Sequence, residues 1–441
     1  MILQTLLLSL APIASAGEST TQLPSLFAIR VGRAETIAKG TLEHAVILVE
    51  DGKILKIGED LPVARGIPVI DRPDWVVMPG LVNAYSRLSL EGEAGEEFNP
   101  EVKASAELYA GSDELKDVVK YGVTTLGLYP AGSGICGQSV AIRPLGKSAA
   151  DLVLQDSCYL KIVLRATSSS KKALQDGFKK ADDYADKEKK AKEKWDKDQE
   201  KKKAKPAKKE EPKPDEQKGG EEKKEDPKPE EKKDAGADTY VPPEADPKTQ
   251  PFLDLRSGKL HALVSLQSAA EYLHFLDAIG KEGFAWDLRL PLQRESDLFY
   301  VLDKKTYELD VDGIGDRKCR VVLEPNLTLQ PGTMREWNIA KELSRKGAKI
   351  VFIPRSDTLN DMRDWLPDVG EMIASGLDRE VALRAVTSEP AALLGLDGRL
   401  GSLEKGKDAD IVFLSGDPFQ PSTRIQAVML GGKFVHGEVK P

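Results

Sequence analysis

Residues 76–90, VVMPGLVNAYSRLSL, hold the most informative pattern in the chain. An apolar run is interrupted by Pro79-Gly80, resumes briefly, and then carries polar side chains at alternate positions. This pattern predicts a buried strand that opens into a polar mouth. Side chains two residues apart on a strand point to the same face. Tyr85 and Arg87 are therefore expected to face one side together.

Strand-like and helix-like segments alternate through most of the chain after this stretch. Strands are predicted at residues 76–87, 123–129, 160–164, 261–266, 286–290, 320–324 and 349–353. Helices are predicted at residues 112–121, 269–279, 334–346, 362–375 and 379–394. Such alternation is typical of a parallel α/β fold. Seven strands suit a (β/α)8 barrel with one strand unrecognised. A doubly wound sheet is the alternative, and the lack of G-x-G-x-x-G after a strand disfavours it.

The two ends of the chain contain a different pattern, that of β-hairpins. Residues 45–50 and 53–57 are separated by Asp51-Gly52, and residues 426–430 and 433–436 by Gly431-Gly432. Such dipeptides between alternating apolar runs are strong hairpin signals. With a further strand at 410–414, the pattern predicts one small β-sandwich built from residues 17–77 and 402–441.

Charge is distributed unevenly along the 441 residues. Charged residues make up 31% of the chain and are concentrated at residues 171–248, a Lys/Glu/Pro-rich insertion. Residues 171–203 could form a solvated helix with i,i+4 Glu–Lys pairs. Residues 205–233 lack the apolar groups needed to offset ordering entropy and are predicted to be disordered. The net charge of −8 disfavours non-specific binding to nucleic acid, and no apolar run approaches a membrane span.

The first sixteen residues, MILQTLLLSLAPIASA, fit a secretory signal peptide cut before Gly17. A misassigned start or a buried N-terminal helix is the alternative. Export would place the protein in the periplasm or outside the cell. Export would also allow one disulfide among Cys136, Cys158 and Cys319, whereas three buried thiols are the other interpretation.

Four motifs together resemble the imidazolonepropionase-like family of the amidohydrolase superfamily. They are VMPGLV at 77–82, GVTTL with GICGQSVAIR at 122–143, GLDREVALRAVTSEPAALLGL at 376–396, and RLGSLEKGKDADIVFLSGD at 399–417. The resemblance implies a (β/α)8 barrel from residues 78–170 and 249–401, flanked by a composite β-sandwich from both termini. It is faint over residues 151–345.

The resemblance also implies a chemistry. The family hydrolyses C–N bonds, as in cyclic amides, with one or two divalent metals such as zinc at the C-terminal face of the barrel. The metal lowers the pKa of a bound water and polarises the substrate carbonyl. Two of its histidine ligands would fall at Tyr85 and Arg87, and later ones near Ser265 and Gln267. Of the family's ligands, the resemblance retains only Asp357.

Four histidines occur in the chain, and none forms an H-x-H pair. A fixed positive charge at Arg87 repels a cation, so no bound metal is expected. The former ligand positions Tyr85, Arg87, Ser265 and Gln267 would instead line a pocket for a polar or anionic group, or simply fill the space. Asp357 could be a retained catalytic carboxylate paired with Arg87, or a helix N-cap.

Two functional hypotheses follow. The first is a divergent C–N hydrolase with impaired or lost metal-dependent catalysis, in which other carboxylates such as Glu324 or Asp287 could be recruited. The second is a non-catalytic pseudoenzyme that acts as a binding or scaffold protein. The expected partners are a small-molecule ligand and a second subunit, either the same chain or a related amidohydrolase.

Overall fold

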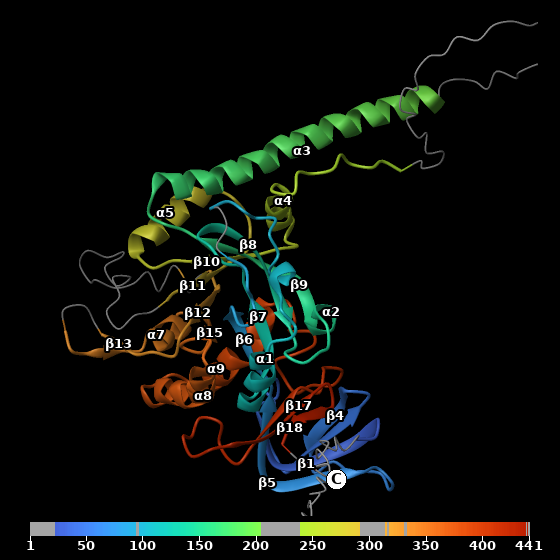
Figure 1. Cartoon of the computed structure of the whole chain (residues 1–441), viewed down its shortest axis with the longest axis vertical. Helices are drawn as coiled ribbons and strands as arrows, with labels where there is room; N and C mark the ends of the chain where they lie inside the picture. Colours follow the sequence, from blue (N-terminus) through green and yellow to red (C-terminus); the bar gives the residue numbers. More distant parts are fainter. Residues whose placement is uncertain are drawn as a thin grey trace, which may run out of the picture.

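The computed structural model describes residues 23–93, 97–203, 239–291, 314, 317–329, 333–437 and 439. Two eight-stranded sheets form a β-sandwich and a barrel, with the sandwich at one end of the barrel and the long helix α3 at the other (Figure 1). The signal peptide predicted at residues 1–16 lies outside the described residues, as does the predicted disorder at 205–233. Within the described residues, no helix combines the length and apolarity needed to cross a membrane.

The sandwich brings the two ends of the chain into one sheet. Its strands are β1 (Leu26–Glu35), β2 (Thr41–Glu43), β3 (Ala45–Glu50), β4 (Lys53–Glu59), β5 (Val69–Pro79), β16 (Ile411–Leu414), β17 (Ile425–Leu430) and β18 (Lys433–His436). Strand β5 pairs with β1 on one side and with β16 on the other. Both predicted hairpins form, and their turns touch, because a Cβ on Gly52 would lie 2.6 Å from the carbonyl oxygen of Gly431.

Pro79 and Gly80 join the sandwich to the barrel. The single strand predicted at 76–87 is in fact two strands, with β5 ending at Pro79 and β6 (Leu81–Ser86) starting the barrel. A Cβ on Gly80 would lie 2.0 Å from the Thr124 hydroxyl oxygen. Glycine is thus required here by the close approach of the neighbouring strand.

The predicted eight-stranded barrel is confirmed and is nearly closed. Its strands are β6, β7 (Val123–Leu128), β8 (Gly134–Ile142), β9 (Val153–Val163), β10 (Ala262–Ser265), β11 (Trp286–Arg289), β12 (Arg320–Leu323) and β15 (Lys349–Phe352). The unrecognised eighth strand is β8, and it runs antiparallel to both β7 and β9. The order begins at β15 and ends at β6. Helix α10 (Ser388–Leu393) packs against both of these strands.

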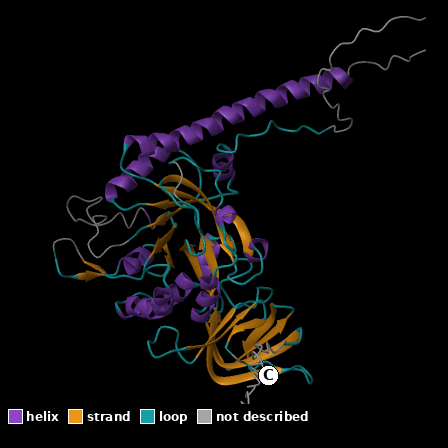
Figure 2. Ribbon diagram, viewed as in Figure 1, coloured by secondary structure: helices purple, strands orange, loops and turns teal. Residues whose placement is uncertain are grey.

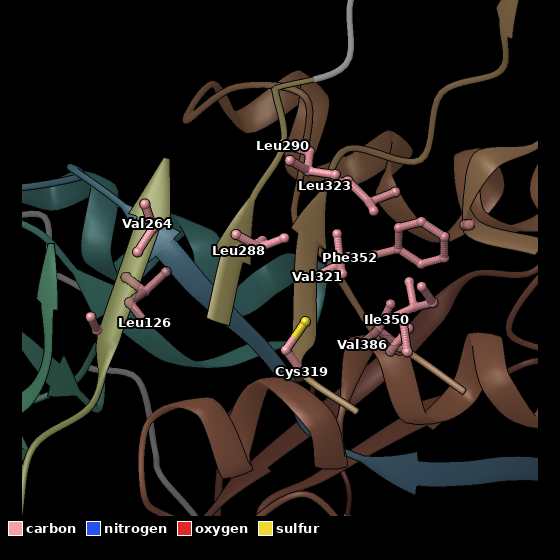
Figure 3. Packing of buried hydrophobic residues seen from close by; sticks show 14 of the residues in the cluster. Leu126, Val264, Leu288, Leu290, Cys319, Val321, Leu323, Ile350, Phe352 and Val386 are labelled. Carbon is pink, nitrogen blue, oxygen red and sulfur yellow. The ribbon is translucent and has the colours of Figure 1, made fainter. Parts of the chain in front are cut away.

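Helices cover the outer face of the barrel and contribute to its largest apolar cluster. The remaining helices are η1 (Ala104–Glu107), α1 (Asp113–Val118), η2 (Val119–Tyr121), α2 (Ala149–Leu152), α3 (Ser168–Lys203), α4 (Gln250–Ser257), α5 (Ala269–Ile279), α7 (Ile339–Arg345), α8 (Leu359–Ala374) and α9 (Arg379–Val386). Two short strands, β13 (Thr328–Leu329) and β14 (Glu336–Trp337), pair with each other. Figure 3 shows Ile350 of β15 beside Val386 of α9, in the cluster that also includes Leu288 and Val321. A separate cluster, with Leu263, Val322 and Val351, fills the barrel interior.

Helix α3 belongs only partly to the insertion predicted at 171–248. Its first turns bury Leu174, Phe178 and Ala181 in the same apolar cluster as the barrel strands. The insertion predicted from residue 171 therefore starts too early. The charge-rich sequence begins there, but the helix still packs on the barrel as far as Ala181. Beyond these turns the helix extends past the barrel (Figure 2). Tyr240 lies beside it, with its ring 5.8 Å from that of Trp195.

Candidate functional site at the barrel mouth

Two stacked tyrosine rings occupy the C-terminal mouth of the barrel. The pairing of β6 with β7 shifts register between Asn83 and Ser86, and Tyr85 lies in that interval. Its ring stacks on that of Tyr129, which follows β7, with centroids 3.9 Å apart and planes 24° apart. Burial raises the pKa of both phenols above the ordinary value. Both tyrosines therefore stay neutral at physiological pH.

Two cations lie beside this stack, and they donate hydrogen bonds to the carbonyls of two consecutive residues. The Nζ atom of Lys161, on β9, donates to the carbonyl of Pro130 at 3.2 Å and lies 4.1 Å from the centre of the Tyr129 ring. Nη1 of Arg87 donates to the carbonyl of Tyr129 at 3.0 Å. Lys161 is only 4% exposed, whereas the Arg87 side chain is 25% exposed. The two positive groups are thus held next to each other at the mouth.

Burial has a further effect on Lys161. It lowers the pKa of the amine below the ordinary 10.5, and the charge of Arg87 lowers it further, while the Cys136 thiol has the opposite effect. Arg87 also donates from Nη2 to the Gly92 carbonyl at 2.8 Å, and it lies 3.9 Å from Glu107. Arg87 therefore has a carboxylate neighbour, whereas the contacts of Lys161 within the described residues are to a carbonyl and a ring.

A third cation, Arg289 of β11, lies over the Tyr85 ring of the stack. Its guanidinium carbon is 5.3 Å from the centre of the Tyr85 ring. Arg289 forms a two-point ion pair with Glu324, which follows β12, including a bond of 3.2 Å from Nη1. It is 5% exposed, and its Nε is buried without a hydrogen-bond partner in the described part of the chain.

Asp357 joins the last barrel strand to the first. Its carboxylate accepts a 2.6 Å hydrogen bond from the Ser86 hydroxyl and a 2.8 Å bond from the Arg87 backbone N–H. The guanidinium of Arg87 instead contacts the carbonyls described above, so the expected side-chain ion pair is replaced by a backbone contact. The helix N-cap interpretation of Asp357 is wrong, because Thr358 caps α8.

The other predicted site residues are divided between three places. Ser265 ends β10 and is buried at the mouth. Gln267 lies outside the barrel and accepts a bond from Arg165 on the exposed surface, because β10 has ended before it. Asp287 lies at the opposite end of the barrel from the mouth, where it accepts from the Arg320 N–H and lies 3.7 Å from His261.

The donor set at the mouth does not fit a catalytic divalent metal. Among the described residues, no three His, Cys, Asp or Glu side chains come together in a way that could hold a metal ion. Zinc requires three or four nitrogen, sulfur or carboxylate ligands, and both oxygens of Asp357 already accept hydrogen bonds. Lys161 adds buried positive charge, which repels a cation at this location, whereas the charge of Arg289 is balanced by Glu324.

Sequence reasoning missed Lys161, Arg289 and Tyr129. A basic residue inside a largely apolar strand, as Lys161 in YLKIV and Arg289 in WDLRL, is the signal that could have found the two cations. Such a residue is almost never fully buried unless it is paired or functional.

Comparison with known proteins concerns the family and the fold of the chain. Residues 353–436, which run from the end of β15 through the last sandwich strand, match a family model described as "Amidohydrolase family". This match supports a relationship to the amidohydrolase superfamily. A search of curated proteins gives no match.

Solved structures similar to this chain share its fold. An amidohydrolase from Thermotoga maritima is 19% identical, with 93% of this chain and 100% of that chain covered and a TM-score of 0.70. A Xaa-Pro dipeptidase with methionine bound in its active site is 12% identical, with 93% and 99% covered and a TM-score of 0.51. At these identities the likeness concerns architecture, so the activity must be argued from this chain's own mouth residues.

Proposed function

We propose that this amidohydrolase-superfamily chain is a binding protein whose barrel mouth holds the anionic group of a small molecule. In this proposal, fixed cations of the protein stand in place of the catalytic metal, and the ligand is bound without metal-dependent hydrolysis. The observation that carries it is the buried ammonium of Lys161 beside Arg87, on the neighbouring carbonyl. An anion lying between the two would satisfy both charges.

The free energy of burying Lys161 supports this proposal. Removing an ammonium from water is costly unless it is paired and fully hydrogen-bonded. An ammonium has three N–H donors, and within the described residues one of them is used, by the Pro130 carbonyl. A carboxylate or phosphate oxygen would satisfy the remaining donors and the charge at once.

A divergent C–N hydrolase is the second candidate, and Asp357 is the observation that favours it. The residue stands where relatives place a proton-transferring carboxylate. Its two oxygens, however, accept from Ser86 and from the backbone of Arg87. That arrangement gives Asp357 a role in holding the mouth together, and it leaves the binding function as the better-supported proposal.

Metal analysis separates the two candidates. We expect the purified chain to carry well below one equivalent of zinc or any other divalent metal, because the histidine ligands are replaced. Elemental analysis by mass spectrometry measures this directly. One or more tightly bound divalent ions per chain would contradict the proposal and favour the hydrolase.

Ligand binding tests the same proposal from the other side. A small carboxylate such as lactate should raise the thermal midpoint of the wild type in a concentration-dependent manner, because a ligand that binds only the folded state stabilises it. Lys161→Met should lose this shift. Lys349→Met, at an exposed lysine that starts β15, should retain it. Equal shifts in both variants would mean that the anion binds elsewhere.

A further inference from the structure

Lys161 combines two properties of a lysine that reacts with carbonyl groups. It is buried at the C-terminal end of a barrel strand, and a second cation is held beside it. Among the lysines of the described residues, only Lys161 is buried. We propose that Lys161 binds α-oxo acids covalently as an imine, with Arg87 holding the carboxylate. This inference rests on the proposed anion-binding function and names its ligand class.

The placement of the two cations on neighbouring residues' carbonyls suits such a ligand. Arg87 and Lys161 donate to the carbonyls of Tyr129 and Pro130, which are neighbours in the chain. Consecutive residues have their Cα atoms about 3.8 Å apart. In an α-oxo acid, the carboxylate and the reactive carbonyl carbon are also directly adjacent. The proposal therefore places the carboxylate at Arg87 and the adjacent carbonyl carbon at Lys161, two groups close enough for the charge of Arg87 to lower the pKa of Lys161.

The environment of Lys161 increases the fraction of neutral amine, the form that the reaction needs, while the protonated form remains available to bind an anion. A protonated amine has no free electron pair and cannot attack a carbonyl. Burial and the charge of Arg87 both lower the pKa of this amine, and desolvation or a neighbouring cation is a known way to activate a lysine nucleophile. Arg87 remains charged, because a guanidinium does not lose its proton in proteins.

The covalent step balances without any further reactant. The nitrogen lone pair of Lys161 attacks the carbonyl carbon, a C–N bond forms, and the C=O π electrons move to oxygen. Both amine hydrogens pass to that oxygen, the C–O bond breaks, and water leaves. The products are one imine and one water from one amine and one oxo acid. Addition of water reverses the reaction and releases the ligand.

Borohydride trapping tests the proposal on the full-length protein. The chain is incubated with pyruvate, reduced with sodium borohydride, and examined by intact mass spectrometry and by mapping of proteolytic peptides. We expect one reduced adduct per chain, located at Lys161. Lactate has the same carboxylate but no carbonyl, and it should lower the yield by competing for Arg87. Lys161→Arg should abolish the adduct, and Lys349→Arg should leave it unchanged.

The possible outcomes are distinguishable. An adduct spread over exposed lysines, or no adduct at Lys161, overturns the imine proposal. If lactate still raises the thermal midpoint in that case, the anion-binding function stands and only the covalent step is wrong. If lactate has no effect on the midpoint or on trapping, the binding function itself is wrong. Peptide mapping of the wild-type adduct locates the lysine even if Lys161→Arg does not fold.

Discussion

At the level of single residues, the mouth shows how a change of side-chain type changes what a barrel can hold. Tyr85 and Arg87 stand where the family resemblance places histidines, and Lys161 and Arg289 add buried positive charge. A histidine nitrogen donates its lone pair to a metal, whereas an ammonium or guanidinium has only N–H donors. In the proposed function, the same scaffold position therefore selects an anion instead of a cation.

Asp357 gives a direct stability prediction. Asp357→Asn should lower the free energy of unfolding by about 1–3 kcal/mol, because the amide of asparagine can turn an N–H donor toward Ser86 or the Arg87 backbone and leave a buried donor unpaired. Urea denaturation measures the change. Asp364→Asn is the matched control, since its partner Arg363 is 58% exposed, and its effect should stay within about 1 kcal/mol. Equal effects of the two substitutions would show that Asp357 does not hold the last barrel strand to the first.

His261, at the end of the barrel opposite the mouth, predicts a dependence of stability on pH. Burial lowers its pKa below the ordinary 6.5; Asp287 opposes this shift and Arg320 adds to it. The folded state therefore favours the neutral ring. The contribution to stability is complete above pH 6.5 and is lost as the pH falls through the folded-state pKa.

The wild type should accordingly lose more free energy of unfolding than His261→Gln when the pH falls from 7 to below 6. Urea titrations at several pH values measure this difference. Burial also lowers the pKa of His436. His436→Gln is therefore measured alongside, to separate its contribution from that of His261. Parallel curves for the wild type and His261→Gln would contradict the prediction.

How much of the site the sequence predicted depends on what each residue reveals locally. The motif around Pro79-Gly80 placed Tyr85 and Arg87, and the end of a strand placed Asp357. Gln267 was predicted to line the mouth, but β10 ends at Ser265, two residues before it. Lys161 and Arg289 carry no motif of their own, and their grouping depends on the closure of distant strands.

At the level of elements, most strands could be predicted because parallel barrel strands are near-continuous apolar runs. Strand β8, which the sequence pattern did not identify, is the exception. Its antiparallel direction follows from short connections, residues 129–133 and 143–152, which leave no room for a crossover helix of usual length. The predicted helix at 334–346 begins late, at Ile339, because residues 336–337 pair as β14 instead.

Helix α3 should respond very differently to substitution along its length. Phe178→Ala should cost about 3–5 kcal/mol, since the ring is 2% exposed and packs 5.1 Å from both Phe252 and Phe284. Trp195→Ala, further along the same helix beside Tyr240, should cost about 1 kcal/mol or less. Thermal and chemical denaturation of both variants measure this. Similar losses would mean that the outer helix is part of the same cooperative unit.

For the whole molecule, an ion-pair network connects the barrel to the sandwich. Arg143, just after β8, donates from Nη2 to Asp410 at 2.9 Å and to Asp408 at 3.2 Å. The Asp410 side chain is 4% exposed, and burial raises its pKa although Arg143 opposes this shift. Asp410 also accepts from the Gly431 N–H. The network therefore fixes the C-terminal hairpin against a barrel strand.

Loss of Arg143 should weaken both parts together. Arg143→Met leaves the Asp410 carboxylate buried without its cation, which should cost about 3–5 kcal/mol. Lys53→Met removes a 55% exposed partner of Asp408 and should cost about 1 kcal/mol or less. Unfolding followed by tryptophan fluorescence and by circular dichroism would test this. A loss for Arg143→Met no greater than that for Lys53→Met would contradict it.

The sandwich also has a consequence for synthesis on the ribosome. Strand β5 is made early, yet its partner β16 begins at residue 411. A nascent chain emerges from its N-terminus and folds as it appears, so one edge of β5 waits while the whole barrel is translated. During that time the edge is an unpaired strand open to other chains. A polypeptide released before residue 411 keeps that edge exposed, so premature termination creates an aggregation-prone product even when every barrel strand is present.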